Sequence, residues 1–213
     1  MHKRFAAIGL AILFMWPGNC VAQSVAPGPV RVGDRWLYDV KDEATGDLRF
    51  AVTHVVVEVT NKEITIRALA KGRDRAQTLV YDLDWSLIDD GNWKYRPSDG
   101  SGIQAPLQVA KTWRFENQST HYQTGASLRT TGQSKVVGNE KVTTNADTFD
   151  TFKIETTRRL INANDQTKST TLNLTTWYAP TINRWVRRIL KSYSDGRLRD
   201  SVELELTEHS RKP

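Results

Sequence analysis

The stretch RWVRRILKSYSDGRLRDSVELELTE, residues 184–208, predicts a β-hairpin. Apolar and polar residues alternate on both sides of Asp195-Gly196, a dipeptide that favours a two-residue type I′ turn. Such a turn sets a register that pairs Arg188 with Glu203. The apolar face of this hairpin is then predicted to carry Trp185, Ile189, Tyr193, Leu198, Val202, Leu204 and Leu206.

The same register places Arg187 on the apolar face, between Trp185 and Ile189, whereas Arg184 and Arg188 fall on the solvated face. A buried guanidinium without a partner is too costly to keep. We therefore expect Arg187 to meet a carboxylate, stack on an aromatic ring, reach the edge of the sheet or bind an anionic ligand. The candidate ligand-binding residues are Arg187, Trp185, Trp177 and Tyr178.

The rest of the chain repeats this pattern of short strands and tight turns. Thr, Val, Ile and aromatic residues alternate with polar residues, as in EITIRALA, residues 63–70. The connections are short, and short loops join antiparallel neighbours because a parallel crossover needs many more residues. We expect an all-β fold, a mostly antiparallel meander of ten or more strands that forms a curved sheet, an open barrel or a two-layer β-structure.

One segment interrupts this meander. RPSDGSGIQAP, residues 96–106, is rich in Pro, Gly and Ser and predicts a long loop. Within 97–106 it is a candidate boundary between two halves of a single β-rich domain, which we expect to span residues 23–213.

The first residues have the pattern of a secretory signal peptide, residues 1–22. A basic start is followed by an apolar run, residues 5–16, that is shorter than the roughly 20 residues of a membrane span. Cleavage is expected near Ala22, which predicts a periplasmic or secreted protein. The alternative is a lipoprotein anchored through Cys20, but Pro17 and Asn19 do not fit the residues expected before a lipidated cysteine.

Charge and cysteine usage narrow the classes of partner. The formal charge of +6 falls by two when Lys3 and Arg4 are removed with the signal peptide. The remaining net positive charge is modest, and export from the cytoplasm argues against nucleic acid as a partner. The single cysteine, Cys20, is also removed, so a disulfide-free core must stabilise the mature chain. No later segment is apolar enough to span a membrane, so no transmembrane span is expected in the mature chain.

The sequence predicts neither a metal site nor a cofactor. The histidines of the mature chain, His54, His121 and His209, are far apart and have no cysteine beside them. The glycine patterns that bind phosphates or dinucleotides are absent from the sequence.

The strongest candidates for acid–base chemistry are Asp82 and Asp84. Residues i and i+2 of a strand share a face, and paired carboxylates raise the pKa of one member. A hydrolase built on this pair is one hypothesis. The simpler interpretation is a solvent-facing pair, with Tyr81, Leu83 and Trp85 directed into the core.

Four short motifs are distributed over most of the mature chain: VGDRWLY (32–38), YDLDWSLI (81–88), VVGNEKVTTNADTFDTFKIE (136–155) and WYAP (177–180). Together they resemble a family of uncharacterised bacterial exported β-rich proteins, a domain of unknown function. The resemblance implies a domain of the cell envelope without an established enzyme activity, and it transfers no catalytic residue. Members of that family read Val-Gly or Gly-Val-Gly after the WYAP-like motif, whereas this chain has Thr181-Ile182-Asn183.

The aromatic residues suggest two alternative roles. Such rings either fill the core or line a concave face that binds an apolar or amphipathic ligand. We expect a non-enzymatic β-domain of the cell envelope with such a ligand, for example a lipid. The alternative is a structural or interaction protein that binds another envelope protein through a sheet edge or a basic face.

Overall fold

The computed structural model describes residues 28–211, and the expected signal peptide and Cys20 lie outside the described residues. The described chain forms twelve strands and one short 3-10 helix, η1. Their bounds are β1 (Arg35–Asp42), β2 (Leu48–Val59), β3 (Glu63–Ala70), β4 (Gln77–Asp82), β5 (Leu87–Asp89), β6 (Trp93–Arg96), β7 (Thr112–His121), β8 (Ser127–Thr143), β9 (Thr148–Asn162), β10 (Asp165–Ala179), η1 (Pro180–Ile182), β11 (Arg184–Ser194) and β12 (Arg197–Ser210).

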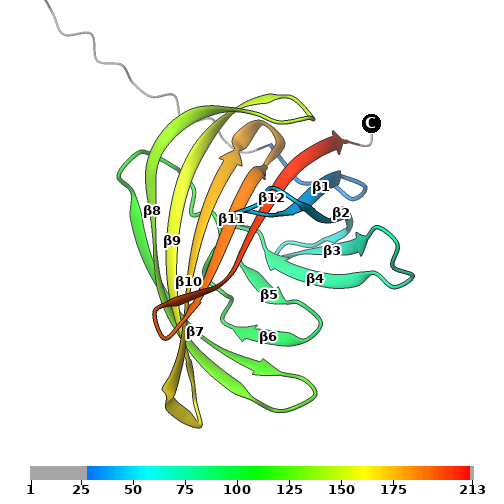
Figure 1. Cartoon of the computed structure of the whole chain (residues 1–213). Helices are drawn as coiled ribbons and strands as arrows, with labels where there is room; N and C mark the ends of the chain where they lie inside the picture. The colour runs from blue at the N-terminus through cyan, green and yellow to red at the C-terminus, as the bar shows by residue number, and fades with distance from the viewer. Residues whose placement is uncertain (1–27, 212–213) are drawn as a thin grey trace, which may run out of the picture.

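The strands form a closed antiparallel barrel in which each strand pairs with its neighbours in sequence. Closure comes from β1, which pairs with β12 on one side and with β2 on the other. In Figure 1 the long strands β8–β11 stand side by side as a tall curved wall, and the shorter strands β3–β6 cross the view at a steep angle to them. The all-β, antiparallel meander expected from the sequence is thus confirmed, and its sheet closes.

The last hairpin has the predicted turn but a different register. Asp195 and Gly196 both have positive φ, 51° and 73°, as a type I′ turn requires. The register then shifts between Tyr193 and Ser192, which leaves Arg199 as an extra residue on β12. Because side chains alternate with a period of two, this bulge changes which residues of β11 share a face with Leu204.

The predicted faces of Arg187 and Arg188 are therefore wrong, and Arg184, predicted on the solvated face, is fully buried. Arg188 lies opposite Leu204 and faces the interior, and Arg187 lies opposite Glu205 and faces outward. A second register shift between β10 and β11 leaves Val186 without a partner.

The second shift explains how Trp185 and Arg188 come to face the same side. Tyr178 pairs with Trp185 while Trp177 pairs with Arg187, so the intervening Val186 reverses the alternation. As a result, Trp185 and Arg188 are in contact inside the barrel, with the Arg188 guanidinium carbon 3.7 Å from the centre of the Trp185 ring.

A cluster of aromatic rings forms the centre of the core. Trp85 lies edge-on to Trp36, Tyr81 and Trp185, with ring centres 5.6–6.0 Å apart. These four rings and Tyr38 are at most 7% exposed. Edge-to-face pairs each contribute about 0.5–1.5 kcal/mol beyond the apolar area that they bury. Aromatic packing therefore supplies much of the core, as the sequence suggested for a chain without disulfides.

The loop predicted at residues 96–106 folds back against inward-facing side chains. Asp99, on this loop, is buried and forms an ion pair of 2.8 Å with Arg158 of β9. Ile103 and Leu107 join the core. Gly102 is required here, because a Cβ atom would lie 2.4 Å from the backbone oxygen of Asp84.

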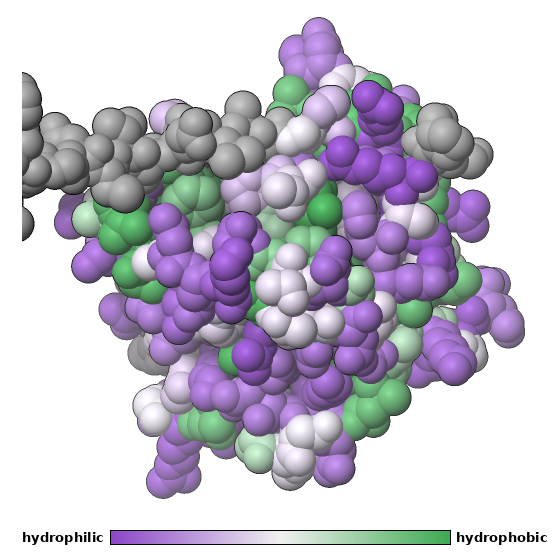
Figure 2. Space-filling model, turned by 90° about the horizontal axis from the view of Figure 1, so that it is seen from above, coloured by the Kyte–Doolittle hydropathy of each residue, from purple (hydrophilic) through white to green (hydrophobic). Residues whose placement is uncertain are grey.

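The outer surface is mostly polar. Figure 2 shows the face above the view of Figure 1, where hydrophilic side chains predominate and apolar ones form separate spots. Over residues 28–211, the structure has no helix with the length and apolar character of a membrane span.

Candidate functional site

The candidate site is built around two arginines that face the interior of the barrel. Arg184 is fully buried, and its guanidinium carbon lies 3.4 Å from the centre of the Trp185 ring and 4.0 Å from that of Trp85. The centres of the Trp36 and Tyr81 rings lie farther from this carbon, at 5.0 and 5.3 Å. This arginine is thus enclosed by aromatic faces, which attract a cation.

Arg184 also donates a hydrogen bond from Nη2 to Nδ1 of His54, at 3.1 Å. His54 is buried on β2, and burial together with the positive charges of Arg184 and Arg188 lowers its pKa to about 3. At neutral pH the imidazole is therefore uncharged and can accept this hydrogen bond on Nδ1.

Arg188 is less completely enclosed. Its Nε donates to Oγ1 of Thr176 at 3.1 Å, and one ring, that of Trp185, covers its guanidinium. Burial lowers the pKa of Arg188 to about 10, so the group stays protonated at neutral pH. Inside the barrel this arginine has fewer compensating contacts than Arg184.

Neither arginine has a carboxylate as a direct partner among residues 28–211, although the charge of Asp99 acts on Arg188. Tyr38 donates its hydroxyl to the backbone oxygen of Trp185 at 2.9 Å, and burial raises its pKa to about 12, so it is neutral. The buried carboxylate of Asp99 is already paired with Arg158.

On the two arginines and on Trp36 and Trp185, the unpartnered buried polar atoms are all donors. Among the described residues they are Nε and Nη1 of Arg184, Nη2 of Arg188, and the indole nitrogens of Trp36 and Trp185. A buried donor without an acceptor costs about 1–3 kcal/mol, and more when it is charged. Desolvated cation–π contacts contribute about 2 kcal/mol each, which offsets this cost better for Arg184, with four rings, than for Arg188, with one.

Next to Arg188 the inner surface is apolar and still reached by solvent. Leu190 pairs with Val202, and Arg188 with Leu204, on the inner face of β11 and β12. All three aliphatic side chains are partly exposed. An inward-facing side chain is exposed only where solvent enters the barrel, so the interior is open at this level.

Strand β2 continues the same surface. Phe50 lies opposite Val40 and shares its face with Val52 and His54. The Phe50 side chain is 45% exposed although it faces inward. The inner apolar wall, as we define it, consists of Phe50, Val52, Leu172, Leu190, Val202 and Leu204.

The structure separates the four candidate residues that the sequence suggested. Trp185 and Tyr178 are buried inside. Arg187 points outward, where its Nε forms an ion pair of 2.5 Å with Glu203 and its guanidinium lies 5.1 Å from the Trp177 ring. The carboxylate and the stacked ring expected for Arg187 are therefore both present, on the outer surface.

Trp177 lies on this outer surface too. Its indole nitrogen donates to Glu140, and Lys153 lies 5.1 Å from its ring. The ring is only 7% exposed because these long side chains cover it. Trp177 therefore does not share a face with Trp185.

Asp82 and Asp84 lie at a turn. The strand ends at Asp82, whose Oδ1 accepts hydrogen bonds from the backbone nitrogens of Asp84 and Ser86. Burial raises the pKa of both carboxyls. Leu83 is 48% exposed, so its predicted place in the core is wrong, whereas Tyr81 and Trp85 are buried as expected.

One residue of the site region escaped the sequence reasoning, Asn183. It follows η1 with φ of 48°, and its Oδ1 accepts from the indole nitrogen of Trp85 at 3.0 Å and from the hydroxyl of Tyr178 at 2.6 Å. Its Nδ2 donates to the backbone oxygen of Gly28 at 2.8 Å. Asparagine tolerates this left-handed conformation better than most residues, and this tolerance is the only signal that the sequence offers at position 183.

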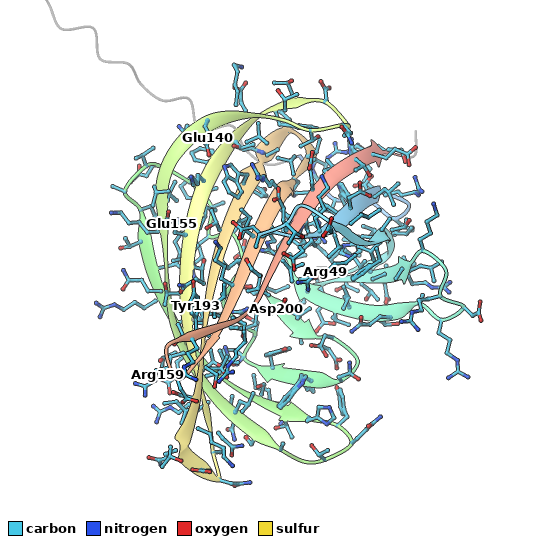
Figure 3. All side chains as sticks on the ribbon, in the orientation of Figure 1. Arg49, Glu140, Glu155, Arg159, Tyr193 and Asp200 are labelled. Atoms are coloured by element: carbon cyan, nitrogen blue, oxygen red, sulfur yellow. The ribbon has the colours of Figure 1, made fainter. Side chains whose placement is uncertain are left out.

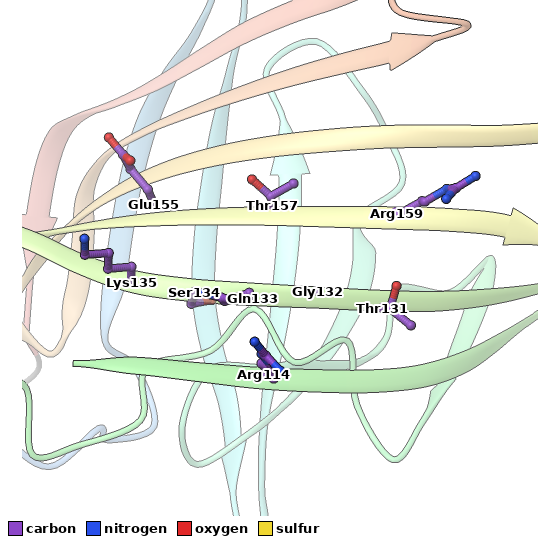
Figure 4. A pocket seen from close by; sticks show the side chains of 9 residues that line it. All are labelled: Arg114, Thr131, Gly132, Gln133, Ser134, Lys135, Glu155, Thr157 and Arg159. Atoms are coloured by element: carbon purple, nitrogen blue, oxygen red, sulfur yellow. The ribbon is translucent and has the colours of Figure 1, made fainter. Parts of the chain in front are cut away.

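The outer surface carries a basic hollow over β7–β9, with a volume of about 520 Å³. Figure 4 shows Arg114, Lys135 and Arg159 around it, together with the single carboxylate Glu155. Across residues 28–211, no group of three or more His, Cys, Asp and Glu side chains is arranged to hold a metal ion.

Comparison with known proteins identifies the fold. No family model matches the chain, so membership of the family suggested by its motifs stays a prediction. No curated protein matches it either.

Two solved structures share the fold over most of the chain. One is an exported protein with a YmcC-like fold from Bacteroides fragilis, at 12% identity and a TM-score of 0.54, covering 88% of this chain and 100% of that one. The other is assigned as a lipoprotein from Parabacteroides distasonis, at 13% identity and a TM-score of 0.51, covering 85% and 97%. At this identity the likeness shows a common fold.

Proposed function

We propose that this protein is a non-enzymatic β-barrel of the bacterial cell envelope that binds an apolar or amphipathic ligand inside the barrel. The inner apolar wall carries this proposal. Phe50 faces inward and is nevertheless 45% exposed, a large apolar surface left uncovered in the interior of the fold. Covering such a surface with a ligand is favourable by about 25 cal/mol per Å² of apolar area removed from water.

The envelope location draws on two kinds of support. The first is the apolar run that follows a basic start in residues 1–22. The second is that the two fold relatives are described as an exported protein and a lipoprotein. A periplasmic protein with a cleaved signal and a lipid-anchored form are both compatible with this location.

The test compares two exposed apolar residues on opposite faces of adjacent strands. Phe50 on β2 faces inward and Leu69 on β3 faces outward, and their exposed fractions, 45% and 42%, are nearly equal. The protein is purified from its own envelope and examined by native mass spectrometry. A co-purifying lipid mass is expected in wild type and in Leu69→Asp, and its loss is expected in Phe50→Asp. Equal retention in both variants would exclude the inner apolar wall as the binding surface.

The second candidate function is recognition of an envelope protein through the basic hollow over β7–β9. The closed barrel pairs β1 with β12, so the sheet-edge version of this hypothesis loses its edge. The hypothesis of a basic binding face relies on Arg114, Lys135 and Arg159, which line this hollow. A stoichiometric protein partner without any lipid mass in the same spectra, lost on Arg159→Glu, would favour this candidate over the first.

A further inference from the structure

Resting on the proposed function, we infer that the ligand of the barrel is an amphipath with an anionic end group, carboxylate or phosphate, and that Arg188 binds this group while the inner apolar wall covers the chain. The observation behind it is the juxtaposition of a buried cation that has an unpartnered donor, Nη2 of Arg188, with the inner apolar wall.

The chemistry of the cluster selects an anion. The unpartnered buried atoms on Arg184, Arg188, Trp36 and Trp185 are all donors. A cationic or neutral amine end group would bring further donors to a site whose arginine and tryptophan donors already lack partners. A carboxylate or phosphate offers acceptors only and carries the opposite charge, and its hydrogen bonds to a guanidinium are among the strongest that proteins make.

The groups that face Arg188 leave it free for such a ligand. The hydroxyl oxygen of Thr176 on β10 accepts a hydrogen bond from Nε of Arg188, and the Trp185 ring covers the guanidinium. Tyr38 of β1 donates its hydroxyl hydrogen to the backbone oxygen of Trp185. His54 of β2 is the acceptor for Arg184.

The position of Arg188 suits contact with a ligand better than that of Arg184. Arg184 is 0% exposed, beneath four rings. Arg188 is partly exposed as a residue and is paired with Leu204 of the inner apolar wall, although its Nη2 is shielded from water. A change of side-chain rotamer brings that nitrogen to a ligand on the wall, with Arg184 behind it as a second positive charge.

The test uses three amphiphiles with the same chain: dodecanoate, 1-dodecanol and dodecylamine. Each is titrated into delipidated protein by calorimetry, below its micelle concentration or, for 1-dodecanol, below its solubility limit. Dodecanoate is expected to bind at least tenfold more tightly than dodecanol, and dodecylamine most weakly. Dodecyl phosphate is expected to match dodecanoate. Acetate and inorganic phosphate, which have the charge without the chain, are expected to bind at least a hundredfold more weakly.

Variants assign the effect to one arginine. Arg188→Met should lower the affinity for dodecanoate to that for dodecanol and leave dodecanol binding unchanged. The matched control is Arg187→Met, the adjacent residue on the outer face, which should leave all affinities unchanged. Arg188→Lys keeps the charge but loses the planar fork, and should retain part of the preference for dodecanoate.

A readout on the ligand-free protein separates binding from structure. Because Arg188 is a buried cation without a carboxylate partner, Arg188→Met is expected to keep or raise the unfolding midpoint of delipidated protein. A purely structural arginine would lower both the midpoint and the affinity for dodecanol on substitution, and that result would overturn the inference.

The outcomes distinguish this inference from the function on which it rests. Equal binding of the three amphiphiles would overturn the anionic end group and leave a barrel that binds apolar chains. Tight binding of acetate or inorganic phosphate would also overturn it, because the site would then take a free anion. Failure of every amphiphile to bind would overturn the proposed function itself.

Discussion

At the scale of the residue, His54 makes the stability of the barrel depend on pH. Its pKa is about 3 in the folded protein, below the ordinary value of about 6.5, because of burial and the charges of Arg184 and Arg188. Below pH 6.5 the unfolded chain takes up a proton that the folded protein refuses until about pH 3. The stabilisation present above pH 6.5 is therefore lost as the pH falls towards 3.

His54→Gln isolates this contribution. Glutamine can accept the hydrogen bond from Arg184 but does not titrate. Between pH 6 and pH 4 the free energy of unfolding of wild type should fall more steeply than that of His54→Gln, by about 1.4 kcal/mol per pH unit. Urea unfolding of both proteins at several pH values measures the difference. Parallel pH profiles would mean that His54 is protonated or accessible in the folded state.

The residues of the site could be predicted only in part from the sequence. Trp185 is interior as expected, whereas Ile189, expected on the same face, lies opposite Glu203 and faces outward. A buried arginine needs a partner, but this rule does not identify which arginine is buried. The alternation of residue types predicts Arg187 to be buried, whereas Arg187 contacts Glu203 and Trp177 on the outer surface. The arginine that lacks a carboxylate is Arg188, and its position depends on bulges that leave no clear trace in residue types.

At the scale of the element, turns were predictable and register was not. Asp195-Gly196 forms the expected turn because few other dipeptides adopt positive φ at both positions. The extra residue Arg199 follows two pairs later, and any exposed polar residue can occupy a bulge. One shift was enough to exchange the faces of Arg187 and Arg188.

The loop at residues 96–106 gives the element-scale prediction. Asp99 accepts hydrogen bonds from Leu87 and Ser101 and forms an ion pair with Arg158. The side chains of Asp99 and Arg158 are at most 15% exposed. Asp99→Ala leaves the Arg158 charge buried and unpaired, which should cost about 3–5 kcal/mol of stability. Denaturant unfolding of the variant measures this loss.

The double variant shows whether the charge is the cause. Asp99→Ala with Arg158→Met removes the unpaired cation and should recover part of the loss, leaving mainly the broken contacts of the loop. Arg158→Met alone should be milder than Asp99→Ala, because Asp99 retains its three donors from Leu87 and Ser101. A double variant less stable than Asp99→Ala would assign the loss to packing.

At the scale of the whole molecule, the sequence predicted the antiparallel meander but left its closure open. Closure depends on the pairing of β1 with β12, strands from opposite ends of the chain, and local patterns carry no information about such a distant contact. Charged residues reinforce this seam. Lys41 pairs with Glu205 at 2.7 Å, and Arg49 bridges Asp42 and Asp200. Arg49 and Asp200 are labelled near the centre of Figure 3.

A disulfide across the seam tests closure directly. Asp39 lies opposite Glu205 in the register of β1 and β12. In a chain without Cys20, the pair Asp39→Cys and Glu205→Cys should oxidise readily and stabilise the protein by up to about 4–5 kcal/mol, because the crosslink closes a very long loop in the unfolded state. The measurement is the difference in unfolding free energy between the oxidised and reduced forms, with Asp39→Cys alone as the control. Two thiols that stay free under oxidising conditions would show that β1 and β12 are not neighbours in solution, and the barrel, together with the inner wall that it encloses, would have to be redrawn as an open sheet.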